Sequence, residues 1–457
     1  MASSIRTLNP ATGKIEKEFQ QHTTDQINQK IQLADTTYST WRFESFENRK
    51  EVIKAVAAEM RVQKEALATL ITLEMGKPIR ESRIEIDYSA NIFDYYADHA
   101  EEFLQPTPLQ TEKGDALVFS EAIGVLLGVM PWNFPFSQIA RFAAPNIMAG
   151  NTIVLKTASN IPQCAQAFED LFTKVNAPQG IYQNLFLSGK DTSALVADER
   201  IKGVSLTGSD AAGASIAKIA GEHIKKSVLE LGGTDPMIVL NDADIEKVMA
   251  GTINGRLRNA GQACTSSKRI IVQEEIYQTY LERITNHVNQ LKVGNPMEED
   301  TDMGPVSSAS ALETLLDQVS SSVEKGATLI TGGKQLGTEG SFMTPTILTD
   351  LKPGMKAYDQ EVFGPVVCII KVKTIDEAIS IANDTVYGLG ASIYTEDIEL
   401  AHTIARRIDS GMVYINKQVS SSPELPFGGT KRSGYGRELS KAGILEFINK
   451  KLVLTTK

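Results

Sequence analysis

One cysteine, Cys264, follows a turn of small residues within the stretch 255–268. A thiolate that attacks a substrate needs open space and a backbone N–H directed at the oxygen that becomes negatively charged. Gly261 and Ala263 are small enough to leave room for both. We therefore interpret Cys264 as a nucleophile, against the alternative of a small buried hydrophobic residue, which most free cysteines are.

Several short motifs accompany this cysteine along the chain. They are Pro-Trp-Asn-Phe-Pro (131–135), Leu-Glu-Leu-Gly-Gly (229–233), Gly-Gln-Ala-Cys (261–264), Glu-Val-Phe-Gly-Pro (361–365) and Pro-Phe-Gly-Gly (426–429). In order and separation they resemble the aldehyde dehydrogenase superfamily, most closely its succinate-semialdehyde dehydrogenases, from about residue 5 to the C-terminus. The resemblance implies oxidation of an aldehyde to an acid with a nicotinamide dinucleotide.

The resemblance implies catalytic roles for three residues. Cys264 would attack the aldehyde, since a thiolate is a strong nucleophile near neutral pH. Asn133 matches the asparagine whose non-titrating amide stabilises the oxyanion, and its alternative role is in the turn next to Pro135. Glu230 matches the base that activates water to hydrolyse the thioester. It ends an apolar run and precedes two glycines, which is not typical of a surface glutamate.

The same resemblance predicts the cofactor site. Lys156 would contact the adenosine ribose and Glu361 the nicotinamide ribose. Many NAD-preferring relatives carry a glutamate three residues after the lysine, whereas this chain has Ser159, which removes a negative charge that would repel a 2′-phosphate. We therefore predict that NADP is preferred over NAD. The other expected cofactor contacts are Trp132, Gly208, Ser209, Leu231 and Phe363.

Cations are predicted to select the substrate. In succinate-semialdehyde dehydrogenases, arginines at the positions of Arg141 and Arg258 and a serine at that of Ser421 hold the distal carboxylate, and all three match. Phe427 is a further expected substrate contact. The predicted ligand is a small aldehyde that carries a carboxylate. Each arginine has the alternative role of a surface ion pair, and glutarate semialdehyde remains an alternative because the serines before Pro423 depart from the usual loop.

Composition excludes several classes of function. A net charge of −10 argues against nucleic acid and anionic membranes as partners. Three cysteines without a Cys-x-x-Cys pair, and five scattered histidines, predict neither disulfides nor a metal site, and they favour a reducing compartment, the cytoplasm. Cys164 and Cys368 are expected in the core. The N-terminus lacks the pattern of a signal peptide, and no window is apolar enough for a membrane span.

The pattern of helices and strands predicts an α/β protein. Helical windows run to about residue 103, and short apolar strands then alternate with helices over 151–233, which predicts a doubly wound parallel sheet with ligands at the carboxyl ends of its strands. Neither common glycine-rich nucleotide motif occurs there. The candidate pyrophosphate site is therefore 206–209, ahead of a helix that begins near Asp210. A second alternating block follows Cys264.

We expect an aldehyde dehydrogenase-like fold with three parts. They are a Rossmann-type cofactor domain (1–103 and 123–230), an α/β catalytic domain (231–439) and a small β oligomerisation arm (104–122 and 440–457). An exposed apolar strand at a terminus favours pairing with another copy, so a homodimer or homotetramer is expected. The alternative is that the edge strand is covered within the monomer.

Two other functional classes are less consistent with these residues. A cofactor-free cysteine hydrolase needs a base such as histidine next to the thiol, and no histidine lies in a comparable motif. A catalytically silent relative would have lost the nucleophile or the base, and both are present.

Overall fold

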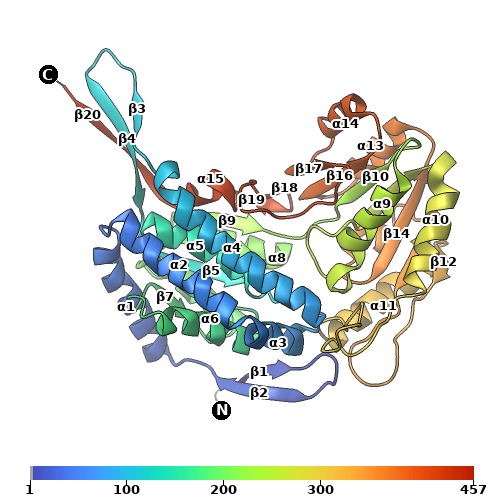
Figure 1. Cartoon of the computed structure of the whole chain (residues 1–457), viewed down its shortest axis with the longest axis horizontal. Coiled ribbons are helices and arrows are strands. Elements are labelled where there is room, and N and C mark those ends of the chain that lie inside the picture. The colour runs from blue at the N-terminus through green and yellow to red at the C-terminus, as the bar shows by residue number, and fades with distance from the viewer. Residues whose placement is uncertain (1–3, 457) are drawn as a thin grey trace.

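The chain is built on two α/β units and a projecting sheet (Figure 1) in a computed structural model that describes residues 4–456. Met1–Ser3 and Lys457, which belong to the predicted N-terminal and arm segments, lie outside the described residues. Among the residues that are described, no helix combines the length and apolar character needed to cross a membrane.

The first unit contains a six-stranded sheet in the order β19-β9-β8-β5-β6-β7. Five strands are parallel, and β19 is antiparallel to β9. The strands are β5 (Val125–Met130), β6 (Thr152–Thr157), β7 (Tyr182–Asn184), β8 (Ile201–Thr207), β9 (Lys226–Glu230) and β19 (Gly434–Tyr435). This sheet confirms the predicted doubly wound topology.

Helices cover both faces of this sheet because its central strands are apolar on both sides. Consecutive residues of β5, Leu126 and Leu127, point to opposite faces and belong to different core clusters. One face packs against α2 (Phe46–Val62), α3 (Lys64–Met75), α4 (Ile79–Phe103), α5 (Ser137–Ala149), α6 (Pro162–Lys174) and α15 (Ser440–Ile444). The other packs against α1 (Thr24–Trp41), α7 (Gly189–Ala197) and α8 (Asp210–Glu222). Buried Cys164 lies in the first of these clusters, as expected.

The helix α1 begins with Thr23 as its N-cap. The Thr23 side chain accepts a hydrogen bond from the backbone of Gln26, and the Gln26 side chain accepts one from the backbone of Thr23. This reciprocal capping box satisfies two backbone N–H groups at once.

The second unit contains a seven-stranded sheet in the order β12-β13-β14-β11-β10-β16-β17, in which only β12 is antiparallel to its neighbour. Its strands are β10 (Pro236–Val239), β11 (Arg269–Gln273), β12 (Thr328–Thr331), β13 (Thr346–Thr349), β14 (Val366–Val372), β16 (Gly390–Tyr394) and β17 (Met412–Ile415). Its helices are α9 (Ile245–Thr252), α10 (Glu274–Val288), α11 (Ala309–Glu324), α12 (Lys356–Asp359), α13 (Ile375–Asn383) and α14 (Ile398–Ala405). The sequence pattern did not predict β10 and β13, which have four residues each.

The structure also contains two small two-stranded sheets. The β1 (Ser4–Leu8) and β2 (Ile15–Gln20) hairpin runs beneath the first unit in Figure 1, and Pro10 in its turn accepts a hydrogen bond from Ser341 of the second unit at 2.8 Å. The strands β15 (Tyr387–Gly388) and β18 (Thr430–Lys431) pair with each other.

The projecting sheet consists of β3 (Thr107–Leu109), β4 (Asp115–Ala122) and β20 (Ile448–Thr455), with β4 in the middle (Figure 1). Residues on it that expose apolar side chains are Leu109, Leu117, Leu452, Val453 and Leu454. The short helix α15, by contrast, packs against α4 and α5 of the first unit. The division of the chain into the three predicted domains stays a prediction.

Candidate active site

The two sheets meet end to end at the candidate site. Parallel pairing places the carboxyl ends of β5, β6, β8 and β9 on one edge of the first sheet. In the second sheet, the loops that lead into β10, β11 and β14 bring Asp235, Cys264 and Glu361 to its amino edge. Since only residues 231–235 connect β9 to β10, the two edges face each other across a short distance.

Two cavities open between these edges and share the residues Cys264 and Gln138. The first brings together the predicted substrate residues Arg141, Arg258, Ser421 and Phe427. The second is lined by the predicted residues Trp132, Asn133, Gly208, Ser209, Glu230, Leu231, Glu361 and Phe363. Cys264 is therefore accessible from both sides, as a nucleophile between a substrate and a cofactor must be.

The turn before Cys264 has an unusual backbone. Asn259 and Ala260 both have a φ of 51°, and Gly261 follows at 72°. Left-handed conformations are uncommon for residues other than glycine and cost free energy, so surrounding contacts must hold them. A Cβ on Gly261 would lie 2.2 Å from the Gly364 carbonyl oxygen, so only glycine fits at that position.

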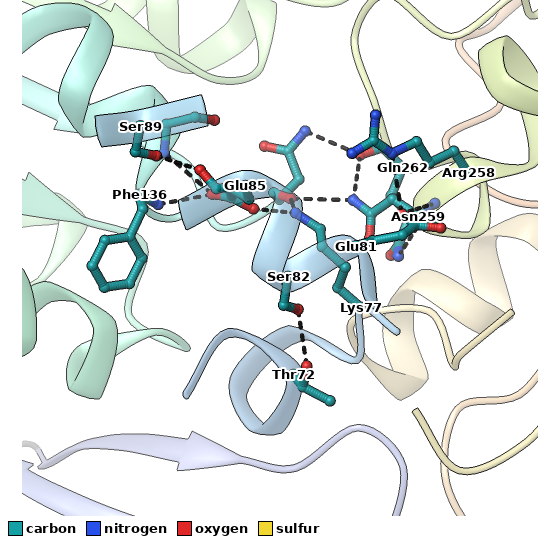
Figure 2. Close-up of polar contacts among 12 residues, drawn as sticks. Thr72, Lys77, Glu81, Ser82, Glu85, Ser89, Phe136, Arg258, Asn259 and Gln262 are labelled. Atoms are coloured by element: carbon teal, nitrogen blue, oxygen red, sulfur yellow. Dashed lines mark hydrogen bonds and ion pairs between the residues drawn. The ribbon is translucent and has the colours of Figure 1, made fainter. Parts of the chain in front are cut away.

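A polar network holds this turn and Asn133 in place. Figure 2 shows Lys77, Glu81, Glu85 and Asn259, which belong to it. Glu81 of α4 accepts a hydrogen bond from the Asn259 backbone N–H at 2.9 Å, and the Asn259 amide donates to the Asn133 carbonyl oxygen at 3.1 Å. Lys77 donates to the same carbonyl at 3.0 Å and pairs with Glu85. Because these hydrogen bonds and this ion pair join Asn259 and Asn133 to the start of α4, they restrict the movement of both backbones.

The side chain of Asn133 points toward the same turn. Its amide donates one hydrogen bond to the Gln262 carbonyl oxygen at 3.1 Å. An asparagine amide has two N–H groups, so the second can donate to a ligand atom next to Cys264. The network thus holds Asn133 in place without using all of its hydrogen-bonding capacity.

Glu230 ends β9 with a side chain that is 2% exposed. Neither carboxylate oxygen has a hydrogen-bond partner among residues 4–456, and a Cβ on Gly428 would lie 2.7 Å from Oε1. Burial, followed by the charge of Glu438, raises the pKa of Glu230 well above its usual value. A carboxylate with a raised pKa is a stronger base for removing a proton from water.

The thiol of Cys264 is protonated at neutral pH in the ligand-free protein. Burial raises the pKa of Cys264 to about 12, and the charges of Asp235 and Glu230 add to the increase. Arg141 and Lys268 oppose it. If Cys264 is the predicted nucleophile, its thiol must lose this proton before it attacks.

The two cations of the first cavity differ in their freedom. Arg141 of α5 is 5% exposed, contacts the carboxylate of Glu438 and lies 3.9 Å above the ring of Phe427. The side chain of Arg258 is 41% exposed, and its Nε is 3.5 Å from a carboxylate oxygen of Glu81. The charge of Arg141 is thus largely compensated within the protein, whereas Arg258 is freer to bind an incoming carboxylate.

The cofactor residues lie at the carboxyl edge of the first sheet. Lys156 is the penultimate residue of β6, where burial lowers its pKa, and Ser159 is exposed just after the strand. Ser209 caps α8 by accepting a hydrogen bond from Ala212 N–H at 3.3 Å. Lys156 and Ser159 are not among the residues that line the second cavity, although Lys156 pairs with Val129 of the neighbouring strand β5.

Three residues of the site were not among the predicted ones. Gln138 lines both cavities, and its carboxamide oxygen is buried without a partner in the described chain. Because Gln138 lies one helical turn before Arg141, the sequence could have indicated that both side chains lie on the same face of the helix. The position of Lys268, four residues after Cys264, was a weaker signal. Glu438 carried no signal, since it comes from a segment distant in sequence from Arg141.

Comparisons with known proteins agree with this geometry. A profile of the Aldehyde dehydrogenase family matches residues 1–453. The chain is 44% identical to succinate-semialdehyde dehydrogenase [NADP(+)] of Deinococcus radiodurans, covering 98% of this chain and 94% of that protein. It is 43% identical to a probable enzyme of the same name from Synechocystis sp., covering 98% and 99%. The crystal structure of succinic semialdehyde dehydrogenase from Streptococcus pyogenes with NADP⁺ superimposes with a TM-score of 0.97, at 43% identity, covering 99% and 100%.

Proposed function

Since this chain belongs to the aldehyde dehydrogenase family of oxidoreductases, we propose that it oxidises succinic semialdehyde to succinate with NADP as the preferred electron acceptor. The observation that carries the proposal is that Cys264 lies where two cavities meet, one with two arginines and the other with a buried base. The relatives named above support the choice of substrate and cofactor.

The residues of the second cavity fit a dinucleotide. Trp132 and Phe363 form an edge-to-face pair with ring centroids 5.9 Å apart, which provides an apolar surface for a nicotinamide ring. Glu361 offers a carboxylate to ribose hydroxyls, and Gly208 and Ser209 precede a helix N-terminus suited to phosphate. When bound, the dinucleotide supplies the acceptor for a hydride.

Oxidation begins with the sulfur of Cys264. The thiol gives its proton to water, and the thiolate attacks the aldehyde carbon to give a tetrahedral thiohemiacetal with a negatively charged oxygen. The second N–H of the Asn133 amide stabilises the negative oxygen. Loss of hydride from this adduct leaves a thioester on Cys264.

Hydrolysis of the thioester needs a base on the second side of the cysteine. The Glu230 carboxylate removes a proton from water, which attacks the thioester carbonyl and releases succinate and the thiol. Its raised pKa and its lack of fixed partners suit this role. Both oxygens remain available to the water.

Arg258 provides the clearest test of carboxylate recognition. We expect Arg258→Ala to raise KM for succinic semialdehyde about 10-fold, because a charge-assisted hydrogen bond contributes roughly 1.5–3 kcal/mol and this side chain is partly exposed. The KM for butanal, which lacks a carboxylate, should change little. Steady-state kinetics with both aldehydes checks this, and equal losses on both would indicate a structural role.

Arg141→Ala is a less selective test. It would leave Glu438 buried without its cation, and the negative charge would act on Glu230, which Arg141 now stabilises in its ionised form. A loss of turnover on both aldehydes in that variant would therefore not exclude binding of the substrate by Arg141.

Ser159 is the residue proposed to permit the 2′-phosphate of NADP. Because it is exposed, Ser159→Glu should fold normally. We expect kcat/KM with NADP to fall about 10- to 100-fold through charge repulsion, while kcat/KM with NAD changes little. If the ratio of kcat/KM with NADP to kcat/KM with NAD were the same in Ser159→Glu as in the unmodified protein, this position would have no role in cofactor choice.

The central experiment is a grid of activities for the unmodified protein. Formation of the reduced cofactor is measured with succinic semialdehyde, glutarate semialdehyde and butanal, each with NAD and with NADP. The proposal requires the highest kcat/KM for succinic semialdehyde with NADP. A higher kcat/KM for glutarate semialdehyde would identify that aldehyde as the substrate. Turnover of butanal alone would show that the enzyme does not recognise a substrate carboxylate.

Two further properties belong to this proposal. The apolar residues exposed on the projecting sheet suit pairing with another copy, so we propose a homodimer or homotetramer. The free thiols suit a reducing compartment, and we propose the cytoplasm.

A further inference from the structure

A buried lysine, Lys268, connects the turn that carries Cys264 to the loop that carries Glu361. Lys268 is 2% exposed, and its ammonium donates to the carbonyl oxygens of Ala263 and Cys264, both at 2.7 Å. The same nitrogen lies 3.0 Å from Oε1 of Glu361. An ammonium group has three N–H bonds, so these three acceptors use its full capacity.

The contact with Lys268 gives the two carboxylate oxygens of Glu361 different surroundings. Oε1 also accepts a hydrogen bond from the Gly233 N–H at 3.1 Å, so it is held by two donors. Oε2 lies over Gly232, where a Cβ would come within 2.7 Å of it. One oxygen is thus anchored, and the other is left to accept hydrogen bonds from a ribose.

The backbone contacts act on Cys264 directly. Two carbonyl groups on either side of the Cα of the nucleophile are fixed by one charged donor, which limits rotation of the turn that carries the thiol. The positive charge also lowers the pKa of Cys264, although burial has the larger, opposite effect. The charged groups that act on this thiol are Arg141, Lys268, Asp235 and Glu230.

We propose that Lys268 is a positioning residue. By holding the backbone on both sides of Cys264 and the ribose-binding carboxylate of Glu361 at once, it fixes the position of the Cys264 sulfur relative to that carboxylate. This rests on the proposed function for the identity of the bound dinucleotide. Neither carbonyl nor Oε1 is available to substrate, so Lys268 acts through the two residues that it holds.

The test compares Lys268→Met with Lys225→Met. Lys225 is a matched control because it also donates to two backbone carbonyls, those of Val196 and Asp198, but away from the nucleophile turn. Titration calorimetry gives the Kd for NADP. The rate of Cys264 alkylation by iodoacetamide is measured against pH, since the other two cysteines are buried.

For Lys268→Met we expect a Kd for NADP about 10-fold higher and alkylation about 10-fold slower at pH 8, with its profile displaced to higher pH. Lys225→Met should resemble the unmodified protein in both. In Glu361→Gln, the added effect of Lys268→Met on Kd should fall below about threefold, because the two residues act on one contact. Equal behaviour of the two lysine variants, or a full effect without the Glu361 carboxylate, would overturn the proposal.

If Lys268→Met does not fold, Lys268→Ala is assayed with ethylammonium, which can occupy the vacated space. Recovery of NADP affinity by ethylammonium, but not by tetramethylammonium, which has no N–H, supports the proposal. No recovery, or failure of both variants to fold, would assign Lys268 a purely structural role and overturn it. Binding and alkylation do not require turnover, so a failure of the proposed reaction would be recognised separately in the activity of the unmodified protein.

Discussion

Replacing the Cys264 sulfur with oxygen, in Cys264→Ser, is expected to lower kcat for succinic semialdehyde oxidation by at least roughly 10⁴-fold. A serine hydroxyl at this position has no histidine to accept its proton, and its pKa is far above that of a thiol. Without an adduct on the enzyme there is no tetrahedral centre from which hydride can leave. The rate of NADPH formation measures the effect.

The comparison requires that the variant still folds and binds its ligands. Sulfur and oxygen differ little in size, so the melting temperature and the Kd for NADP should stay close to those of the unmodified protein. Cys164→Ser is the matched control, since Cys164 is a buried thiol of the α6 helix outside both cavities. Substantial turnover by Cys264→Ser would remove the basis of the proposed reaction.

Glu230→Gln is expected to separate the two halves of the reaction. Glutamine has almost the same shape but cannot accept a proton from water, so hydrolysis of the thioester should slow about 10²- to 10⁴-fold. Hydride loss from the first adduct does not need this base. Rapid mixing should therefore show a burst close to one NADPH per active site, followed by slow steady-state turnover.

The same carboxylate predicts the pH dependence of turnover. A base works only when it is ionised, and the pKa of Glu230 is raised, so kcat should decline as the pH falls through a value well above that of an ordinary glutamate. This decline should be absent from the steady state of Glu230→Gln. Glu438→Gln should move it to lower pH, since Glu438 raises the pKa of Glu230 and Arg141 lowers it. An unchanged pH profile of kcat in both variants would assign the titration to another group. In the rapid-mixing experiment, the absence of a burst in Glu230→Gln would mean that Glu230 is already needed before hydride loss.

Much of the fold could be predicted from local patterns. The alternation of short apolar strands with helical windows over 151–233 predicted a doubly wound sheet, and the six-stranded sheet confirms it. Parallel strands that are buried on both faces must be apolar throughout, which makes them visible in a sequence. The short strand β13 was not predicted.

The arrangement of the site shows where local patterns end. The roles of Asn133, Glu230 and Cys264 were predicted from the resemblance of their motifs to a known family, and all three residues line the second cavity. The left-handed conformation of Ala260 could not be predicted, since alanine does not favour it. It exists because Glu81 and Asn133, from separate parts of the chain, hold the adjacent Asn259.

The sequence by itself determined the chemical groups, the strand and helix periodicity, and the order in which the motifs occur. Only the tertiary structure decided the charge states and partners of these groups: Arg141 is compensated by Glu438, and Lys268 holds both the Cys264 turn and Glu361. The reason is physical. Periodicity is a property of neighbours along the chain, whereas desolvation and Coulomb interactions depend on neighbours in space, which for these residues come from segments far apart in sequence.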